Sequence, residues 1–174
     1  MDYITKSTNR RALRAFSKIF RRLFGVKDES APFPVLEALE RLPDIFQGCS
    51  VSIVSDDALP PHTPARCFPD GTAFTIEVKE TVYRGAYEKQ IGAYLGFICH
   101  EICHIFLFYI GFTPIVARSF GNDEIVPYQS VEWQAKALCG EVMMPYQATA
   151  HMSVKELMCK YHVSKASAQY RQKY

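Results

Sequence analysis

Residues 91–112 read IGAYLGFICHEICHIFLFYIGF, an apolar run with the pattern H-E-x-x-H at its centre. His100, Glu101 and His104 form this pattern. Residues four apart lie on one face of a helix with Cβ atoms about 5–6 Å apart, so both imidazoles can reach one metal ion. Glu101 lies about 100° further around the helix, within reach of a water held by that ion. The stretch therefore predicts a buried helix that carries part of a metal centre.

The residue types in this pattern suit zinc chemistry. Zinc takes imidazole nitrogens as ligands, and a hydrolytic site keeps one coordination position open for water. A nearby carboxylate is needed to accept the proton of that water. A plainer interpretation also fits, in which the two histidines and the glutamate belong to a core helix and bond to neighbouring polar groups.

A hydrolytic zinc site needs a third protein ligand, and the sequence downstream offers several candidates. They are Asp123, Glu124, Glu132, Glu141 and His151. Glu132 and Glu141 are nine residues apart on one predicted helix and point about 180° apart, so only one of them can face the metal. Spacing alone does not choose between the candidates.

The apolar run is long enough to span a membrane, but its ionisable residues fall at its middle, where charged groups are costly. A soluble protein with a core helix is therefore expected. The first 22 residues are polar and rich in arginine, without the apolar core of a secretory signal. Six cysteines occur without a C-x-x-C pair, which indicates reduced thiols in a cytoplasmic protein. Cys99 and Cys103 face about 100° away from the histidines, so packing is favoured over ligation.

Charge is distributed unevenly along the 174 residues, although the net charge is only +2. Residues 1–27 hold eight Lys and Arg against one Asp, whereas residues 28–150 hold seven against sixteen Asp and Glu. Residues 9–24 form a basic amphipathic helix, with Leu13, Phe16, Ile19, Phe20, Leu23 and Phe24 on one side. Docking on the body or on a partner, binding to an anionic membrane surface and contact with nucleic acid all fit this helix.

Three β-rich stretches precede the H-E-x-x-H helix. They are residues 50–54 (SVSIV), residues 66–68 and residues 73–78, the last two flanking the turn Pro69-Asp70-Gly71. We expect a small antiparallel sheet of about three strands, packed on helices that include the H-E-x-x-H helix. Further helices are predicted at residues 35–42, 131–143, 154–161 and from residue 165 onward, with Ser130, Ser153 and Ser164 as N-caps. The fold class is therefore α+β.

The chain divides into three parts on this reading. Residues 1–30 form the basic amphipathic helix and a linker, residues 31–150 form the metal-binding domain, and residues 151–174 form short helices that pack on it.

Glu132 to Pro145, EWQAKALCGEVMMP, resembles the second signature of ImmA/IrrE-family metallopeptidases, roughly E-x-x-A-N-x-F-A-x-E-L-L-M-P. The matching positions are Glu132, Ala135, Glu141, Met144 and Pro145. The later segment ELMCKYHVSKASAQYR resembles the ending of the same family. The resemblance covers about residues 35–172. Three positions depart from the family pattern: Lys136 replaces the usual Asn, Leu138 replaces Phe and Cys139 replaces Ala. Residues 82–95, which lead into the motif helix, also do not match the family.

The resemblance implies a zincin-like fold and a zinc-dependent endopeptidase. The implied ligands are His100, His104 and Glu132, with Glu101 as general base, and another divalent metal can serve the same ligand set. Similar proteins cleave helix-turn-helix repressors or antitoxins, often encoded beside them on phages and mobile elements. A regulator of that class is thus the expected protein partner, and no direct binding to nucleic acid is expected.

Two other functions fit the same sequence. One is a non-catalytic zincin-fold partner of a transcriptional regulator or a toxin–antitoxin component, because fold and motif do not guarantee turnover. The other is a protein held at an acidic membrane surface by residues 9–24. An endopeptidase also needs a group that stabilises the oxyanion, for which Tyr109, Tyr128, Tyr146 and His151 are candidates.

Overall fold

The computed structural model describes residues 2–114 and 125–174. Its elements in chain order are α1 (Arg10–Leu23), α2 (Val35–Glu40), α3 (Leu42–Ile45), β1 (Ser50–Val54), β2 (Ala65–Asp70), β3 (Ala73–Lys79), α4 (Glu80–Lys89), α5 (Gly92–Tyr109), the 3-10 turn η1 (Pro127–Gln129), α6 (Val131–Met143), α7 (Tyr146–Thr149), α8 (Val154–Tyr161) and α9 (Lys165–Lys173). The expected α+β class is confirmed, since a three-stranded sheet packs on helices that include the H-E-x-x-H helix.

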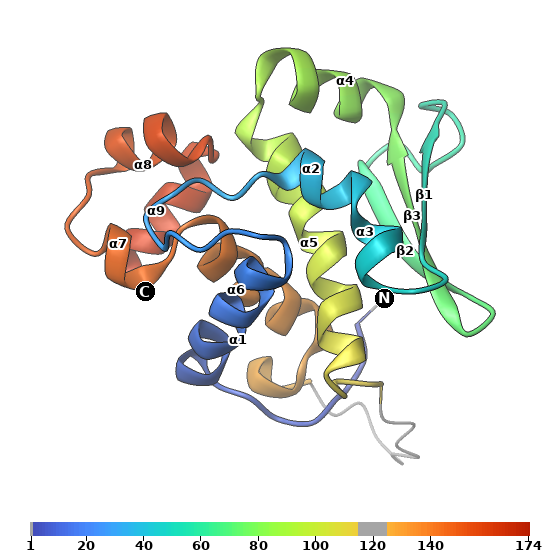
Figure 1. Ribbon diagram of the computed structural model, residues 1–174, viewed down its shortest axis with the longest axis horizontal. Helices are drawn as coiled ribbons and strands as arrows, with labels where there is room; N and C mark the ends of the chain where they lie inside the picture. The colour runs from blue at the N-terminus through green and yellow to red at the C-terminus, as the bar shows by residue number, and fades with distance from the viewer. Residues whose placement is uncertain (1, 115–124) are drawn as a thin grey trace.

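Helix α5 lies at the centre of the fold, with the sheet on one side and α1, α6 and the C-terminal helices on the other (Figure 1). The isoleucines on its inner face are fully buried at positions 98, 102 and 105. Gly111, which has a φ of +88°, follows the end of the helix, because glycine adopts this conformation without steric cost. By length and composition α5 also qualifies as a membrane span, and 44% of its residues are buried inside the protein.

The sheet has the order β1-β3-β2 and is mixed rather than wholly antiparallel. Strands β2 and β3 form the expected antiparallel hairpin around Gly71, whose φ is +63°. Strand β1, however, pairs parallel with β3, with Ser50 opposite Thr75. The expectation of a purely antiparallel sheet was wrong at this pairing, because β3 inserts between β1 and β2 instead of extending a meander.

Local signals predicted most helices, and two departures have clear causes. The helix predicted at residues 35–42 ends at Glu40, and a second short helix begins at Leu42 with Pro43 in its first turn. Proline is tolerated there because the first helical N–H groups have no intrahelical acceptor. Helix α4 was not predicted. Its Gly85 lies against Tyr94 of α5, where a Cβ atom would come within 2.6 Å of the ring.

Helix α1 packs on α6 and contributes Leu13 and Phe20, both fully buried, to the core. The predicted division into an apolar and a basic side is only partly right. Ile19 and Leu23 are exposed, whereas Arg21 is buried. Docking on the body is therefore the arrangement that the structure adopts for this helix.

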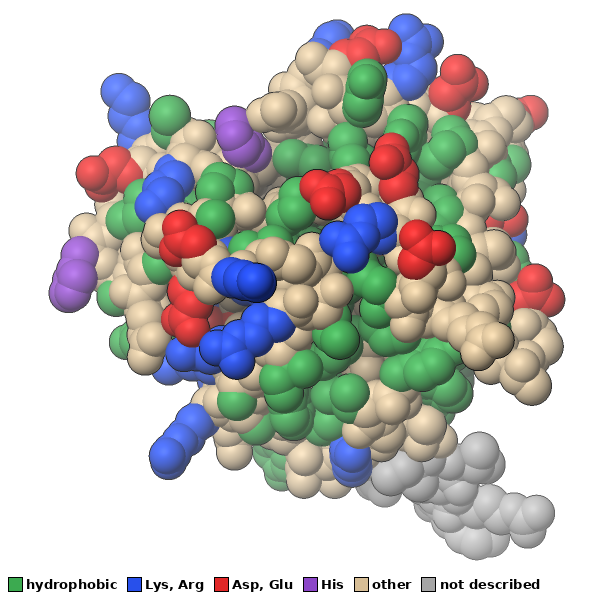
Figure 2. Space-filling model, in the orientation of Figure 1, with side chains coloured by type: hydrophobic (Ala, Val, Ile, Leu, Met, Phe, Trp, Pro, Cys, Tyr) green, Lys and Arg blue, Asp and Glu red, His purple; other side chains and the backbone are tan. Residues whose placement is uncertain are grey.

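The basic residues of α1 are largely used inside the protein. The buried guanidinium of Arg21 donates hydrogen bonds to the carbonyl oxygens of Val142 at 2.7 Å and Ala31 at 2.6 Å. Lys18 forms an ion pair with Glu29 at 3.0 Å. Among the residues drawn in colour in Figure 2, basic and acidic side chains are interspersed over α1 and α2 rather than gathered into one large basic patch.

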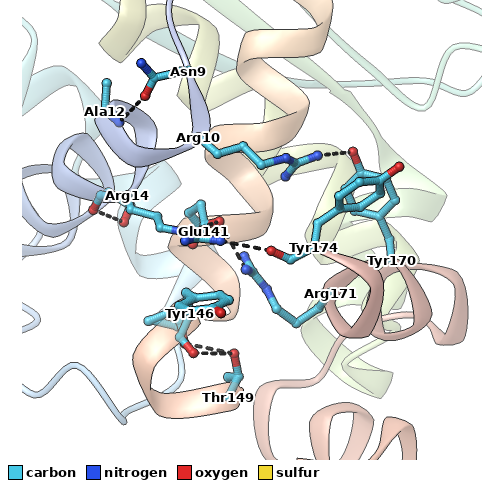
Figure 3. A network of polar contacts seen from close by, with 12 residues as sticks. Asn9, Arg10, Ala12, Arg14, Glu141, Tyr146, Thr149, Tyr170, Arg171 and Tyr174 are labelled. Atoms are coloured by element: carbon cyan, nitrogen blue, oxygen red, sulfur yellow. Dashed lines mark hydrogen bonds and ion pairs between the residues drawn. The ribbon is translucent and has the colours of Figure 1, made fainter. Parts of the chain in front are cut away.

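Glu141 joins α6 to both ends of the chain (Figure 3). Its Oε1 atom lies 3.3 Å from Nε of Arg14 in α1 and 3.0 Å from NH1 of Arg171 in α9. Arg14 also donates to the carbonyl oxygen of Tyr174 at 2.9 Å and lies over the ring of Tyr146. The side chain of Glu141 is 1% exposed and that of Arg171 is 5% exposed, so this ion pair is desolvated.

Replacing Glu141 by Gln should lower the free energy of unfolding by about 3–5 kcal/mol, because it leaves the buried Arg171 without its counter-charge. Glu29→Gln is the matched control, since the Glu29–Lys18 pair is about 40% exposed and is worth at most about 1 kcal/mol. Denaturant unfolding of the two variants measures the difference. Equal losses of unfolding free energy in the two variants would show that the Glu141–Arg171 ion pair stabilises the fold no more than the exposed pair does.

Replacing Gly92 by Ala should destabilise the protein by about 1–3 kcal/mol through overpacking. The added Cβ would lie 2.4 Å from the carbonyl carbon of Val163 and 2.7 Å from the nitrogen of Ser164, and backbone atoms cannot move aside cheaply. Gly96→Ala in the same helix is the control, because its Cβ would meet no heavy atom within 4 Å. That change should stabilise the helix by up to about 1 kcal/mol. A stability loss in both variants would contradict this packing.

Candidate metal centre

Three side chains converge between α5 and α6. Nε2 of His100 lies 3.0 Å from Nε2 of His104 and 3.2 Å from Oε2 of Glu132. Nε2 of His104 lies 3.5 Å from Oε1 of the same carboxylate. One ligand atom from each of the three residues fits within 4.8 Å of the others, so this group can hold a metal ion.

The distances within this group suit zinc. Ligands about 2.05 Å from a tetrahedral zinc ion lie about 3.3 Å from one another. Here the two imidazole nitrogens are 3.0 Å apart, and each lies near a different oxygen of Glu132, His100 at 3.2 Å from Oε2 and His104 at 3.5 Å from Oε1. Two imidazoles and one carboxylate leave the fourth position of a tetrahedron to a water or a substrate atom. The same distances also allow hydrogen bonds within the group when a proton takes the place of the metal ion.

The two histidines owe their placement to the core. They lie four residues apart on α5, a helix that packs against α6, α2 and the sheet. Their rings meet edge to face, with centroids 4.6 Å apart. The side chains are 22% and 15% exposed, so the nitrogens reach the surface of a largely buried helix.

Glu132 is placed by the N-terminal segment, which the sequence did not link to the site. The backbone N–H of Glu132 donates to Oδ1 of Asp2 at 3.1 Å. The hydroxyl of Ser130, the predicted N-cap of α6, donates to Oδ2 of Asp2 at 2.6 Å and accepts from the N–H of Trp133. Ile4 forms a β-bridge with Ser130. Residues 2–8 thus fix the first turn of α6, and no local pattern reveals this long-range role.

The charges of the group shift its protonation. Hydrogen bonds from His100 and His104 hold the pKa of the Glu132 carboxyl well below its usual range. Burial acts to lower the pKa of His100, but the hydrogen bond to Glu132 and the neighbouring Glu101 charge outweigh it, and the pKa is raised. Glu132 is therefore a carboxylate at neutral pH, which is the form that binds a cation.

Glu101 lies on the sheet side of this group. Burial raises the pKa of its carboxyl, and the nearby histidines and a hydrogen bond from the backbone N–H of Cys67 partly offset that effect. Cys67 belongs to β2, an edge strand of the sheet. Glu101 is thus held between the histidine face of α5 and the outer edge of the sheet.

The other ligand candidates have different surroundings. Glu141 lies in the ion-pair cluster with Arg14 and Arg171. His151 lines a cavity of about 710 Å³ beside α7 and α9, whose lining does not include the two motif histidines. Asp123 and Glu124 lie outside the described residues. Of the described candidates, Glu132 is the one that meets both imidazoles.

The candidates for the oxyanion role also differ. The Tyr109 hydroxyl donates to the carbonyl oxygen of Gln47 at 3.3 Å, and Arg14 lies over the ring of Tyr146. Tyr128 is 51% exposed and lies four residues before Glu132. Its role stays a prediction. Cys99 and Cys103 are fully buried, as the packing interpretation predicted.

No protein-family model matches the chain, and no curated protein is significantly similar to it. The interpretation of the site therefore rests on its geometry and on the motif resemblance.

Replacing Glu132 by Ala should weaken zinc binding by more than about 100-fold, since even partners outside the ligand set commonly contribute 10- to 100-fold. Competition with a chromophoric chelator measures this change. His62→Ala is the control, because His62 is exposed in the loop between β1 and β2. Equal zinc affinity of the Glu132 variant and the parent protein would exclude this residue as a ligand.

Proposed function

We propose that the protein is a cytoplasmic zinc-dependent endopeptidase of the ImmA/IrrE type, whose substrate is a helix-turn-helix repressor or antitoxin. The observation that carries the proposal is the convergence of His100, His104 and Glu132 with ligand atoms 3.0–3.5 Å apart. The neighbouring Glu101 supplies the acid–base group that hydrolysis requires. The motif resemblance supports the regulator as substrate.

Each residue has a defined task in this proposal. Zinc, when held by the two imidazoles and the Glu132 carboxylate, supplies Lewis acidity that polarises a carbonyl and makes water acidic near neutral pH. The Glu101 carboxylate accepts a proton from the attacking water and passes it to the amine that leaves. The carboxylate–imidazole contacts hold the histidine rings in place.

The edge of the sheet supports a peptide as the substrate. Lys79 N–H donates to the carbonyl oxygen of Pro64, so the backbone groups of residues 64, 66 and 68 face β3 and those of residues 65 and 67 face outward. The outward N–H of Cys67 donates to Glu101. Proteins commonly bind an extended peptide by adding it as a strand to the edge of a sheet. A peptide that adds to this edge would have its backbone beside Glu101.

Recognition of the regulator is expected to be a protein–protein contact. Arg14, Lys18 and Arg21 of α1 already have partners within the protein. Deletion of residues 1–27 would remove the buried Leu13 and Phe20, so the role of this helix is better tested by neutralising the exposed Arg11 and Arg22.

Replacing Glu101 by Gln should lower the rate of cleavage by about 10²- to 10⁴-fold while zinc affinity changes little, because the amide cannot accept the proton. The test incubates the zinc-loaded protein with helix-turn-helix regulators from the same genome and follows the fragments by mass spectrometry. Glu88→Gln on the exposed face of α4 is the control. Regulator binding without cleavage by the parent protein would favour the non-catalytic partner instead.

A further inference from the structure

Two glycines of α5 have opposite surroundings. Gly92 is required by close packing, because a Cβ there would overlap the backbone of residues 162–164. Gly96 has no such reason, since a Cβ at this position would meet no heavy atom within 4 Å. Glycine is less favourable than alanine inside a helix, so its presence at an open position calls for another cause. A glycine at this position is explained if a ligand occupies the space that a side chain would fill.

Gly96 lies beside the metal centre. It precedes His100 by four residues and so shares its face of α5. Its carbonyl oxygen lies 3.6 Å from Sγ of Cys139 in α6. One turn later on α5, His100 contacts Glu132, which lies nearer the start of α6. The seam between α5 and α6 therefore runs from the Gly96–Cys139 contact to the His100–Glu132 contact.

Lys136 lies between these two contacts on α6. It follows Glu132 by four residues and precedes Cys139 by three, so it lies within about 60° of both on the helix surface. Lys136 is exposed, and it forms no hydrogen bond or ion pair with any group in residues 2–114 and 125–174. Glu132, its natural i−4 partner, directs both oxygens to the histidines instead. Lys136 is thus a cation without a partner among the described residues, one helical turn from Glu132 on α6, while Gly96 lies one turn from His100 on α5.

We propose that Gly96 and Lys136 form a subsite that binds a carboxylate of the substrate next to the bond that is cleaved. This inference rests on the proposed function. Lysine presents a compact point charge on a flexible stem, which suits a carboxylate. Gly96 leaves the space that the substrate group occupies. The carboxylate belongs either to an Asp or Glu side chain or to a free C-terminus.

Hydroxamates test the subsite without the need for turnover, because they bind an open zinc site directly. The probes are acetohydroxamate, a peptidyl hydroxamate with an acidic side chain and an amidated end, one with a free terminal carboxylate, and the neutral amide analogue of each. The zinc-loaded protein should bind one of the acidic probes at least about threefold more tightly than its amide analogue, with a smaller difference at high salt. Whichever acidic probe gains affinity identifies the source of the carboxylate.

Lys136→Gln should remove the preference for the acidic probe and leave acetohydroxamate binding unchanged. Lys155→Gln, at an exposed lysine of α8, is the matched control and should keep the preference. Gly96→Leu should weaken the longer probes alone, while Gly96→Ala should keep or raise the melting temperature. Equal binding of acidic and neutral probes, with acetohydroxamate still bound, would overturn the subsite. Failure of acetohydroxamate itself to bind would instead contradict the metal centre, and the subsite with it.

Discussion

The candidate metal centre depends on a core that holds two imidazole nitrogens and a carboxylate within 3.5 Å of one another between α5 and α6. Lone pairs that face one another repel unless a proton or a cation lies between them, so the arrangement favours occupation by a positive charge. The packing around it opposes relaxation. Ile98, Ile102 and Leu138 are fully buried, and α5 and α6 pack on each other, so moving the two helices apart would expose core side chains to water.

Helix α6 carries two carboxylates with different roles, one in the candidate metal centre and one in an ion pair that stabilises the fold. Glu132 at its first turn is half exposed and faces imidazoles, which bind or release cations reversibly. Glu141 is buried on the opposite side and faces Arg14 and Arg171, which keep their charge at any ordinary pH. One carboxylate is therefore available to a ligand, and the other permanently joins α1, α6 and α9.

The sequence was most informative where the signal is local. Ser130 caps α6 and Ser153 forms a capping box with Glu156, as predicted, because such caps involve groups three residues apart. The i,i+4 spacing likewise brought His100 and His104 together. The parallel pairing of β1 and the exposure of Ile19 were missed because they depend on contacts distant in sequence. The choice of Glu132 over Glu141 as the third ligand needed the family resemblance. Their spacing showed only that the two side chains point in opposite directions, so that one of them at most can face the metal.

The part played by Asp2 shows why the site extends beyond its motifs. The Asp2 carboxylate accepts hydrogen bonds from the backbone N–H of Glu132 and from the Ser130 hydroxyl, so it lies at the positive end of the helix dipole and fixes the turn that carries Glu132. Without this anchor the first turn of α6 would fray, as helix ends do, and Glu132 would lose its fixed distance to the imidazoles. Asp2 and Glu132 are 130 positions apart in the sequence, so no local motif reveals this contact, although it fixes the turn that carries a candidate metal ligand. The N-terminal segment thus helps to position the one candidate ligand that the H-E-x-x-H helix does not carry.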